Sequence, residues 1–352
     1  LRRSGKIRKK MFLTHTNSVY SEDTVLLEHI PYPQYVHAIG DPNPVKITTG
    51  LDIMPGQLID YVLRGKYGAE EGTIEHIQYL LSLAQCKVGF ILAAGNTCWT
   101  GYLTSVKRTA KYPVYNIPPM GVSQVYAGYI ANKLGDFEYI ATDSTSCISG
   151  HSAWYTARNM ISLKLLDAVV VVSVDNGLSE EHLSIFGGNK LSKLKDEENS
   201  SDITKFRLGQ GCNISIFESI RTLKYSIKEA PNPSILANIK DIYITAEHHH
   251  SPLGISPTGA GYTKVIESVD TSNIDFIKTH STFSDDNKIE EKLITSKFGN
   301  IRLVNYKLRI GHTMGASTAI ETALAVKEET GIFLSLGAGM GNVFSAAVVE
   351  IL

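Results

Sequence analysis

Short β-branched runs alternate with longer amphipathic stretches along most of the chain. In the first half, apolar residues fill 88–94, 137–142 and 168–174, whereas helical periodicity covers 119–134 and 152–165. Short apolar runs of this kind are typical of buried parallel strands, and the stretches between them are typical of connecting helices. The pattern therefore predicts an α/β fold.

The second half repeats this order of elements. Strands are expected at 213–218, 239–246, 276–278, 332–336 and 343–351, and helices at 261–267 and 315–327. The repetition predicts a duplicated fold with halves at 11–186 and 208–352. The polar segment 187–207 has no apolar period, so we expect a surface excursion there.

Composition excludes several classes of protein. The chain has 352 residues, of which 43% are hydrophobic and 20% charged, so a disordered or fibrous protein is excluded. Lysine and arginine total 34 against 35 acidic residues, so no net charge favours nucleic acid or a membrane surface as a partner. Residues 1–10 hold six basic side chains and are interpreted as a solvated tail or a remnant added to the native chain.

The cysteines and the apolar runs indicate the compartment. Cys86, Cys98, Cys147 and Cys212 are scattered, without metal-binding spacing and without a secretory signal before them. Every apolar run is much shorter than the ~20 residues of a membrane helix. We therefore expect a cytoplasmic protein with no membrane partner.

One cysteine stands at a position of chemical interest. Cys147 follows the strand expected at 137–142 and precedes the helix expected at 152–165. The positive end of a helix favours a thiolate over a thiol, so this position suits a nucleophile, and we expect Cys147 to have the one strongly depressed thiol pKa. A small buried side chain in a tight turn explains this segment alone equally well.

Three further segments carry residue types used in catalysis. They are Thr279–Thr282 with His280, Lys307–Gly315 with His312, and the glycine-rich stretch Ser335–Asn342. Each segment taken singly is weak, because a lone histidine or a glycine-rich turn is more often structural.

Together these segments resemble the thiolase-fold condensing enzymes, specifically the elongating β-ketoacyl-acyl-carrier-protein synthases. The resemblance runs from about residue 88 to the C-terminus. Thr145–Gly150 is similar to the family's T-A-C-x-S-G, and 280–284 to H-G-T-x-T. Residues 307–316 are similar to K-x-x-x-x-G-H-T-x-G-A, and 335–342 to S-F-G-F-G-G-x-N.

The resemblance implies a layered α-β-α-β-α fold and a role for each matching residue. The implied site consists of the acyl-accepting Cys147, the catalytic His280 and His312, Lys307 with its acidic partner Glu321, the pantetheine contacts Thr282 and Ser284, and the oxyanion-hole backbone of Ala338. The implied reaction is decarboxylative Claisen condensation of an acyl group with a malonyl group on acyl carrier protein. No metal or cofactor is implied beyond the carrier's phosphopantetheine.

The resemblance also implies an assembly, and it leaves other functions open. We expect a homodimer or a heterodimer with a ketosynthase paralogue. The alternatives are a priming or non-decarboxylative acyltransferase of the same fold, and a non-catalytic partner subunit that sets chain length. Priming synthases carry asparagine in place of the second histidine, and partner subunits lack the nucleophile.

Several residues depart from the family's pattern. Ser281 replaces a glycine and Gln210 replaces a glutamate. Ala338 replaces an aromatic residue that gates the acyl pocket in relatives. The alanine implies either a more open acyl entrance or a gap filled by Met340 or Phe344.

Overall fold

The computed structural model describes residues 10–21, 34–38, 45–47, 73–95, 123–177, 208–230, 234–251, 255–282 and 286–352. The basic tail at 1–9, Cys98, the segment 187–207 and Ser284 lie outside these residues.

The first half forms a sheet of mixed direction. Its strands, in spatial order, are β5 (Tyr139–Asp143), β4 (Val88–Ala93), β6 (Ala168–Asn176), β7 (Gln210–Ser219) and β1 (Met11–Ser21). β4 runs parallel to β5 and β6, whereas β7 runs antiparallel to β6 and β1 antiparallel to β7. The short strands β2 (Gln34–Ala38) and β3 (Val45–Ile47) extend this sheet from β1.

The second half repeats the same topology. Its spatial order is β10 (Arg302–Val304), β9 (Phe276–Lys278), β11 (Ile332–Gly339), β12 (Val343–Ile351) and β8 (Ala237–Ala246). β9 runs parallel to β10 and β11, β12 antiparallel to β11, and β8 antiparallel to β12. With β2 and β3 left out, the strands of each half follow the same spatial order, third, second, fourth, fifth and first, which is the expected duplication. The first strands of the two halves, β1 and β8, pair antiparallel through Met11–Leu13 and thereby join the two sheets.

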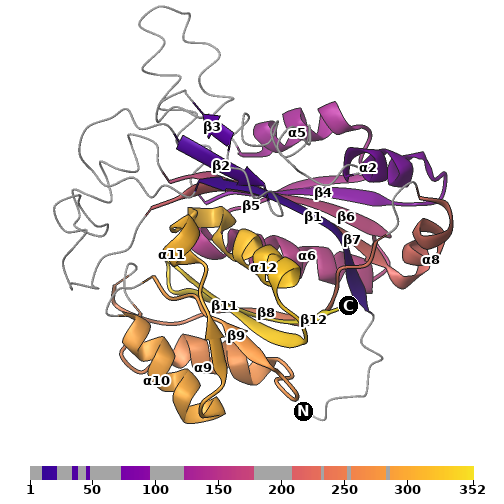
Figure 1. The fold of residues 1–352 in the computed structure, drawn as a ribbon. Coiled ribbons are helices and arrows are strands. Elements are labelled where there is room, and N and C mark those ends of the chain that lie inside the picture. The colour runs from indigo at the N-terminus through magenta and orange to yellow at the C-terminus, as the bar shows by residue number, and fades with distance from the viewer. Residues whose placement is uncertain are drawn as a thin grey trace, which may run out of the picture.

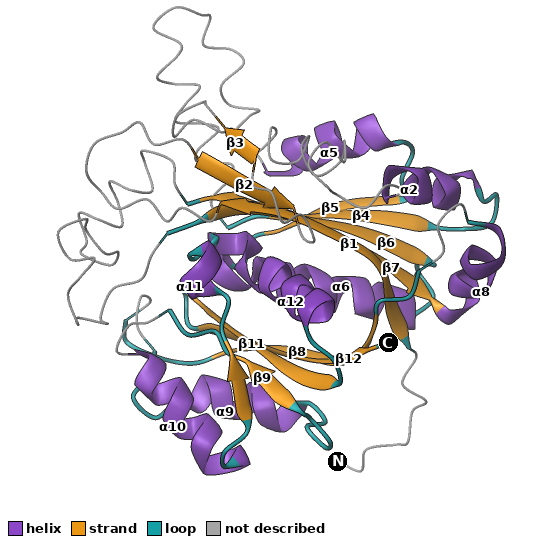
Figure 2. Ribbon diagram, in the orientation of Figure 1, coloured by secondary structure: helices purple, strands orange, loops and turns teal. Residues whose placement is uncertain are grey.

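Helices cover and separate the two sheets. α6 (Ser149–Ser162) and α12 (Ser317–Glu328) lie between the sheets (Figure 1). α2 (Thr73–Ser82) and α5 (Ser123–Leu134) cover the outer face of the first sheet, and α9 (Ala260–Ser268) and α10 (Asp286–Phe298) cover that of the second (Figure 2). α8 (Ile220–Glu229) follows β7, and the single turn α11 (Lys307–Ile310) precedes α12. This layer order confirms the expected α-β-α-β-α fold.

The core is divided by the sheets into three apolar clusters. On β6, Val169 and Val171 belong to the central cluster with Trp154 of α6, whereas Val170 and Val172 belong to the outer cluster under α2 and α5. Successive side chains of a strand point to opposite faces. Because both faces of β6 are covered by helices, its sequence is an unbroken apolar run.

Two expectations about boundaries are wrong. The division expected at 208 falls between β6 and β7, which pair through Ala168–Asn176 and Gln210–Ser219, so the first half extends through α8. The glycine-rich stretch 335–342 was expected to be a turn, but it remains a strand through Gly339 and turns only at 340–342. Pairing with distant strands decides both boundaries.

None of the helices in the described part of the chain is long and apolar enough to span a bilayer.

Candidate active site

Cys147 lies in a sharp elbow between β5 and α6. A short 3₁₀ turn, Ser146–Ile148, joins the two elements, and Ser146 has a φ of 54°, in the left-handed region. Asp143, the last residue of β5, accepts hydrogen bonds from Thr145 Oγ1 at 2.8 Å and from Ser152 Oγ at 2.6 Å. The carboxylate thus ties the elbow to the first turn of α6.

Burial dominates the electrostatics of the Cys147 thiol. Its pKa is raised by burial, and the Ser146 hydroxyl, the charge of Lys307 and the Met340 backbone N–H oppose the rise. The expectation of a strongly depressed pKa is therefore wrong, because Cys147 is a buried residue, 7% exposed, and removal of the thiol from water disfavours the thiolate. Burial also raises the pKa of the Cys86 and Cys212 thiols. The pKa of Cys86 is raised to about 12 by burial and by the charge of Asp167.

The two histidines of the resemblance lie together. The rings of His280 and His312 have centroids 5.7 Å apart and an interplanar angle of 84°. Burial, followed by the charge of Lys307, lowers the pKa of both, that of His312 to about 3. Both imidazoles are therefore neutral at pH 7 and can donate one N–H each.

A backbone hydrogen bond fixes the tautomer of His312. The Met314 N–H donates to His312 Nδ1 at 2.9 Å, so Nδ1 is the unprotonated nitrogen. In a neutral ring the proton then resides on Nε2. His312 thus offers an Nε2–H donor to a bound anion.

The loop that carries His280 is held by α10. Glu290 accepts the backbone N–H groups of His280 at 2.7 Å and of Ser281 at 2.8 Å, one on each carboxylate oxygen. The half-buried Thr282 donates its backbone N–H to Asn287 Oδ1 at 2.9 Å. Ser284, its expected companion in binding pantetheine, lies outside the described residues.

Glu321 of α12 joins two lysines rather than one. Its Oε1 lies 2.6 Å from Lys307 Nζ and accepts a 2.6 Å hydrogen bond from Ser317, and its Oε2 accepts one from Lys278 Nζ at 3.1 Å. The two lysines and Ser317 outweigh burial and lower the pKa of Glu321 to about 2. The Lys307 contact is the one that the resemblance implies, whereas sequence reasoning missed Lys278.

The structure does not place the Ala338 side chain at the site. Ala338 belongs to the apolar cluster beneath α9, together with Phe344, because even-numbered residues of β11 face that cluster. The backbone N–H that acts on the Cys147 sulfur is that of Met340, two residues further along. Of the two alternatives for Ala338, the structure favours the filled gap, because Phe344 lies opposite Ala338 on β12 and packs edge-on against Tyr262 in this cluster.

Gly339 rather than Ala338 faces the nucleophile. A Cβ atom at Gly339 would lie 3.2 Å from the Cys147 backbone nitrogen and 3.3 Å from Ser146 Cβ. The absence of a side chain therefore lets the turn approach the elbow closely.

A second elbow lies in the other half. Met314 has a φ of 49°, and a 3₁₀ turn, Met314–Ala316, leads into α12 as Ser146–Ile148 leads into α6. Gly315 occupies the place that corresponds to Cys147, and its N–H donates to Asp175 at 2.8 Å. Of these two elbows, the first carries a thiol at this place and the second carries none.

His151 of α6 is a further buried residue that sequence reasoning missed. Its Nδ1 lies 2.9 Å from Ser345 Oγ and its Nε2 lies 3.1 Å from Thr322 Oγ1. Burial lowers its pKa well below the usual range, so His151 is a neutral link between α6, α12 and β12. Its position four residues after Cys147 was the available signal.

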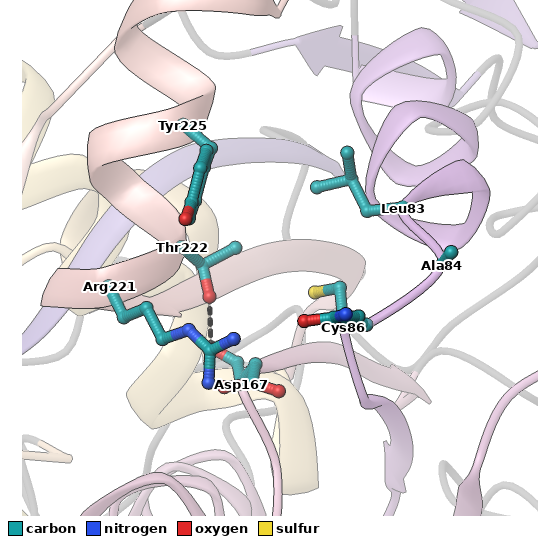
Figure 3. A pocket seen from close by; sticks show the side chains of 8 residues that line it. Leu83, Ala84, Cys86, Asp167, Arg221, Thr222 and Tyr225 are labelled. Carbon is teal, nitrogen blue, oxygen red and sulfur yellow. Dashed lines mark hydrogen bonds between the residues drawn. The ribbon is translucent and has the colours of Figure 1, made fainter.

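A separate pocket lies at the end of the first sheet where the strands β4 and β6 begin, whereas Cys147 follows the other end of the neighbouring strand β5. Arg221, Thr222 and Tyr225 of α8 face Leu83 and Cys86 across it (Figure 3). Its volume of about 240 Å³ is below the ~300 Å³ at which ligand pockets begin. This pocket carries no substrate argument. No histidine is among its lining residues, and Asp167 adds to the effect of burial on the pKa of Cys86, so Cys86 lacks the surroundings that Cys147 has.

Among the residues that the structure describes, no three His, Cys, Asp or Glu side chains are arranged to hold a metal ion.

Comparisons with known proteins agree on the fold. A 3-oxoacyl-[acyl-carrier-protein] synthase 2 from Rhizobium meliloti (strain 1021) is 23% identical over 205 residues, which cover 52% of this chain and 47% of that protein. The match therefore spans about half the length of this curated relative. No protein-family profile matches the chain.

Solved structures resemble the chain over nearly its whole length. A chain of the ketosynthase in complex with its chain length factor from Xenorhabdus doucetiae matches with a TM-score of 0.69 and 15% identity, covering 100% of both chains. A chain of the ishigamide ketosynthase/chain length factor matches with a TM-score of 0.70 and 14% identity, covering 98% of this chain and 100% of that one. The chain therefore shares the thiolase-like fold of these ketosynthase structures over nearly its whole length.

Proposed function

We propose that the chain is a β-ketoacyl synthase that condenses an acyl group on Cys147 with a malonyl group on acyl carrier protein. One observation carries the proposal. The charge of the buried Lys307 lowers the pKa of the Cys147 thiol and of the imidazoles of His280 and His312. All three groups therefore lie within range of the same positive charge. A nucleophile and two neutral N–H donors are the groups that this condensation requires.

The first step loads the enzyme. The Cys147 thiol gives up its proton, and the thiolate attacks the carbonyl carbon of an acyl thioester. A C–S bond to Cys147 forms, the C–S bond to the carrier breaks, and the departing carrier thiolate takes up the proton that Cys147 released. Lys307 and the Met340 N–H oppose the rise in the pKa of this thiol, so they support the thiolate.

The second step releases CO2 and forms the new bond. Loss of CO2 from the malonyl thioester leaves an enolate, whose oxygen accepts hydrogen bonds from His312 Nε2–H and from His280. The enolate carbon attacks the acyl carbonyl, and the Cys147 thiolate leaves as the β-ketoacyl product forms. Neutral imidazoles suit this role, because each donates a hydrogen bond without giving up its proton.

The proposal includes the partners that the reaction needs. The carrier's phosphopantetheine supplies the thioester, so the chain requires no cofactor of its own. Solved structures of similar fold include an acyl-carrier protein in complex with its ketosynthase, and ketosynthases with chain length factors. Either a second copy of the chain or a ketosynthase paralogue is the expected subunit partner.

The alternatives differ from this proposal in single residues. A priming synthase of this fold would carry asparagine at the position of His312, and a non-catalytic chain length partner would lack Cys147. Both residues are present, and His312 is held in the tautomer that donates from Nε2. These observations support the condensing reaction over both alternatives.

Separating the two half-reactions tests the proposal. In His280→Ala and His312→Ala, we expect decarboxylation of malonyl-carrier protein to fall at least tenfold, because each variant removes a donor to the enolate oxygen. Acyl loading on Cys147, measured on the same samples by intact-protein mass spectrometry, should persist and serves as the control. Undiminished decarboxylation in both variants would remove the histidines from the mechanism.

A further inference from the structure

Lys278 is a fully buried lysine that the proposed mechanism does not use. It is the last residue of β9, two positions before His280, and its side chain is 0% exposed. Its Nζ donates to Glu321 Oε2 at 3.1 Å and to the carbonyl oxygen of Leu336 at 2.8 Å. A buried ammonium is costly unless it is paired, so this arrangement calls for an explanation.

The number of charges around Glu321 explains why a buried lysine lies here. Lys307 alone would form a neutral pair with Glu321, and the field of that pair at the nucleophile would largely cancel. Lys278 takes the second carboxylate oxygen and leaves the cluster with one excess positive charge. Besides Glu321, the charged groups that act on Lys278 are Lys307, which lowers its pKa, and Glu290, which raises it. The charged groups that act on Cys147 are Lys307 and Asp175.

The second contact of Lys278 is with the strand that leads to the turn beside Cys147. Leu336 lies on β11, four residues before Met340, whose N–H acts on Cys147. Lys278 therefore connects the strand that leads to His280, the carboxylate that holds Lys307, and the strand that leads to the Met340 turn.

We propose that Lys278 is a positioning residue that offsets the charge of Glu321, so that the charge of Lys307 remains available to the Cys147 thiolate and to an anionic substrate. The substrate part rests on the proposed function, whereas the thiolate part rests on the contacts of Lys278 and Lys307 with Glu321 and on the charge of Lys307 acting on Cys147. Burial lowers the pKa of Lys278 and Glu321 raises it, so the carboxylate is what keeps the ammonium charged.

The pH dependence of Cys147 alkylation tests this inference. Iodoacetamide modification is followed at Cys147 by peptide mass spectrometry across a pH series. In Lys278→Met we expect the midpoint to rise by about one pH unit, the lower end of the effect of a nearby charge, with a roughly tenfold slower rate below it. Lys292→Met, which removes an exposed lysine on α10, should leave the midpoint unchanged.

Two further variants distinguish charge from structure. Lys278→Met combined with Glu321→Gln restores the single excess positive charge, so its midpoint should return toward that of the wild type. Glu321→Gln alone removes the carboxylate that keeps Lys278 charged, so one negative and one positive charge are lost together and the midpoint should stay near the wild-type value. This variant tests the inference even if Lys278→Met does not fold. An unchanged midpoint in folded Lys278→Met, or a midpoint about one pH unit lower in Glu321→Gln, would overturn the role of Lys278 and leave the proposed function standing. A wild-type Cys147 that is not alkylated at any pH would overturn the proposed function instead.

Discussion

At the scale of single residues, two buried carboxylates position the proposed catalytic groups. Glu321 holds Lys307, and Glu290 holds the backbone of His280 and Ser281. Burial raises the pKa of Glu290, while the two N–H groups that it accepts lower it. Each of these carboxylates lies where several donors converge, which offsets the cost of removing it from water.

Replacing Glu290 tests whether its backbone contacts matter. In Glu290→Gln the amide has one acceptor oxygen, so one of the two backbone N–H groups loses its partner. We expect the free energy of unfolding to fall by about 1–3 kcal/mol and malonyl decarboxylation to fall with it. Urea denaturation measures the first effect. Glu291→Gln, at an exposed position of the same helix, is the matched control, and equal stability of the two variants would contradict this role.

The sequence could predict the residues that lie in contiguous motifs. Cys147, His280, Lys307 and His312 each belong to a short segment with recognisable internal spacing. Lys278 could not be found in this way, because its role depends on Glu321, 43 positions away. The pKa of Cys147 was mispredicted for a related reason, since burial is a property of the tertiary structure.

At the level of elements, the close approach of α6 and α12 brings the two halves together. A Cβ atom at Gly150 of α6 would lie 2.7 Å from Ala319 Cβ and 2.8 Å from the Ala319 nitrogen of α12. Small residues at this crossing let two buried helices share the layer between the sheets. The elbow of Cys147 precedes one of these helices, and that of Gly315 precedes the other.

Gly150→Ala is therefore expected to be destabilising. The added methyl group meets backbone that cannot move aside, so the free energy of unfolding should fall by about 1–3 kcal/mol. Gly128→Ala in α5 is the matched control, because no atom lies within 4 Å of its added Cβ. That variant should gain about 0.5–1 kcal/mol from helix propensity. Denaturant midpoints of the two variants that move in the same direction would contradict the tight crossing.

Strand pairing is the part of the fold that local pattern predicts least well. The apolar run of β7 was assigned to the second half, although β7 lies between β6 and β1. Its sequence specifies a buried strand but not its neighbours. The side chain of Ala338 was misplaced for a similar reason, since the direction in which a strand residue points follows from its register.

Over the whole molecule, several imidazoles are buried in neutral form. Burial lowers the pKa of His151 and His280 well below 6.5, and that of His312 to about 3. Between pH 6.5 and 3 the unfolded chain binds protons that the folded chain does not bind. The free energy of unfolding therefore falls as the pH falls through this window. Glu321, whose pKa is lowered to about 2, acts in the same direction below pH 4.5.

The variant His312→Asn measures how much one buried imidazole contributes to the loss of unfolding free energy at low pH. Asparagine can accept the Met314 N–H but does not titrate, so the dependence on pH should weaken. From pH 6.5 to 5 we expect the wild type to lose roughly 1.5 kcal/mol more than the variant, given a folded pKa of about 3. Urea denaturation at the two pH values measures the difference. Parallel losses in both proteins would contradict the burial of a neutral His312.

The central claim is that Cys147 accepts an acyl group from a carrier thioester. Intact-protein mass spectrometry after incubation with a panel of acyl-carrier proteins tests this claim most directly. The wild type is expected to gain the mass of one acyl group, and Cys147→Ala is expected to gain none. The other two cysteines of the described chain lie elsewhere, because Cys86 lines the separate pocket beside α8 and Cys212 belongs to the outer apolar cluster of the first sheet. An acyl adduct that persists in Cys147→Ala, or no adduct on the wild type with any member of the panel, would contradict it.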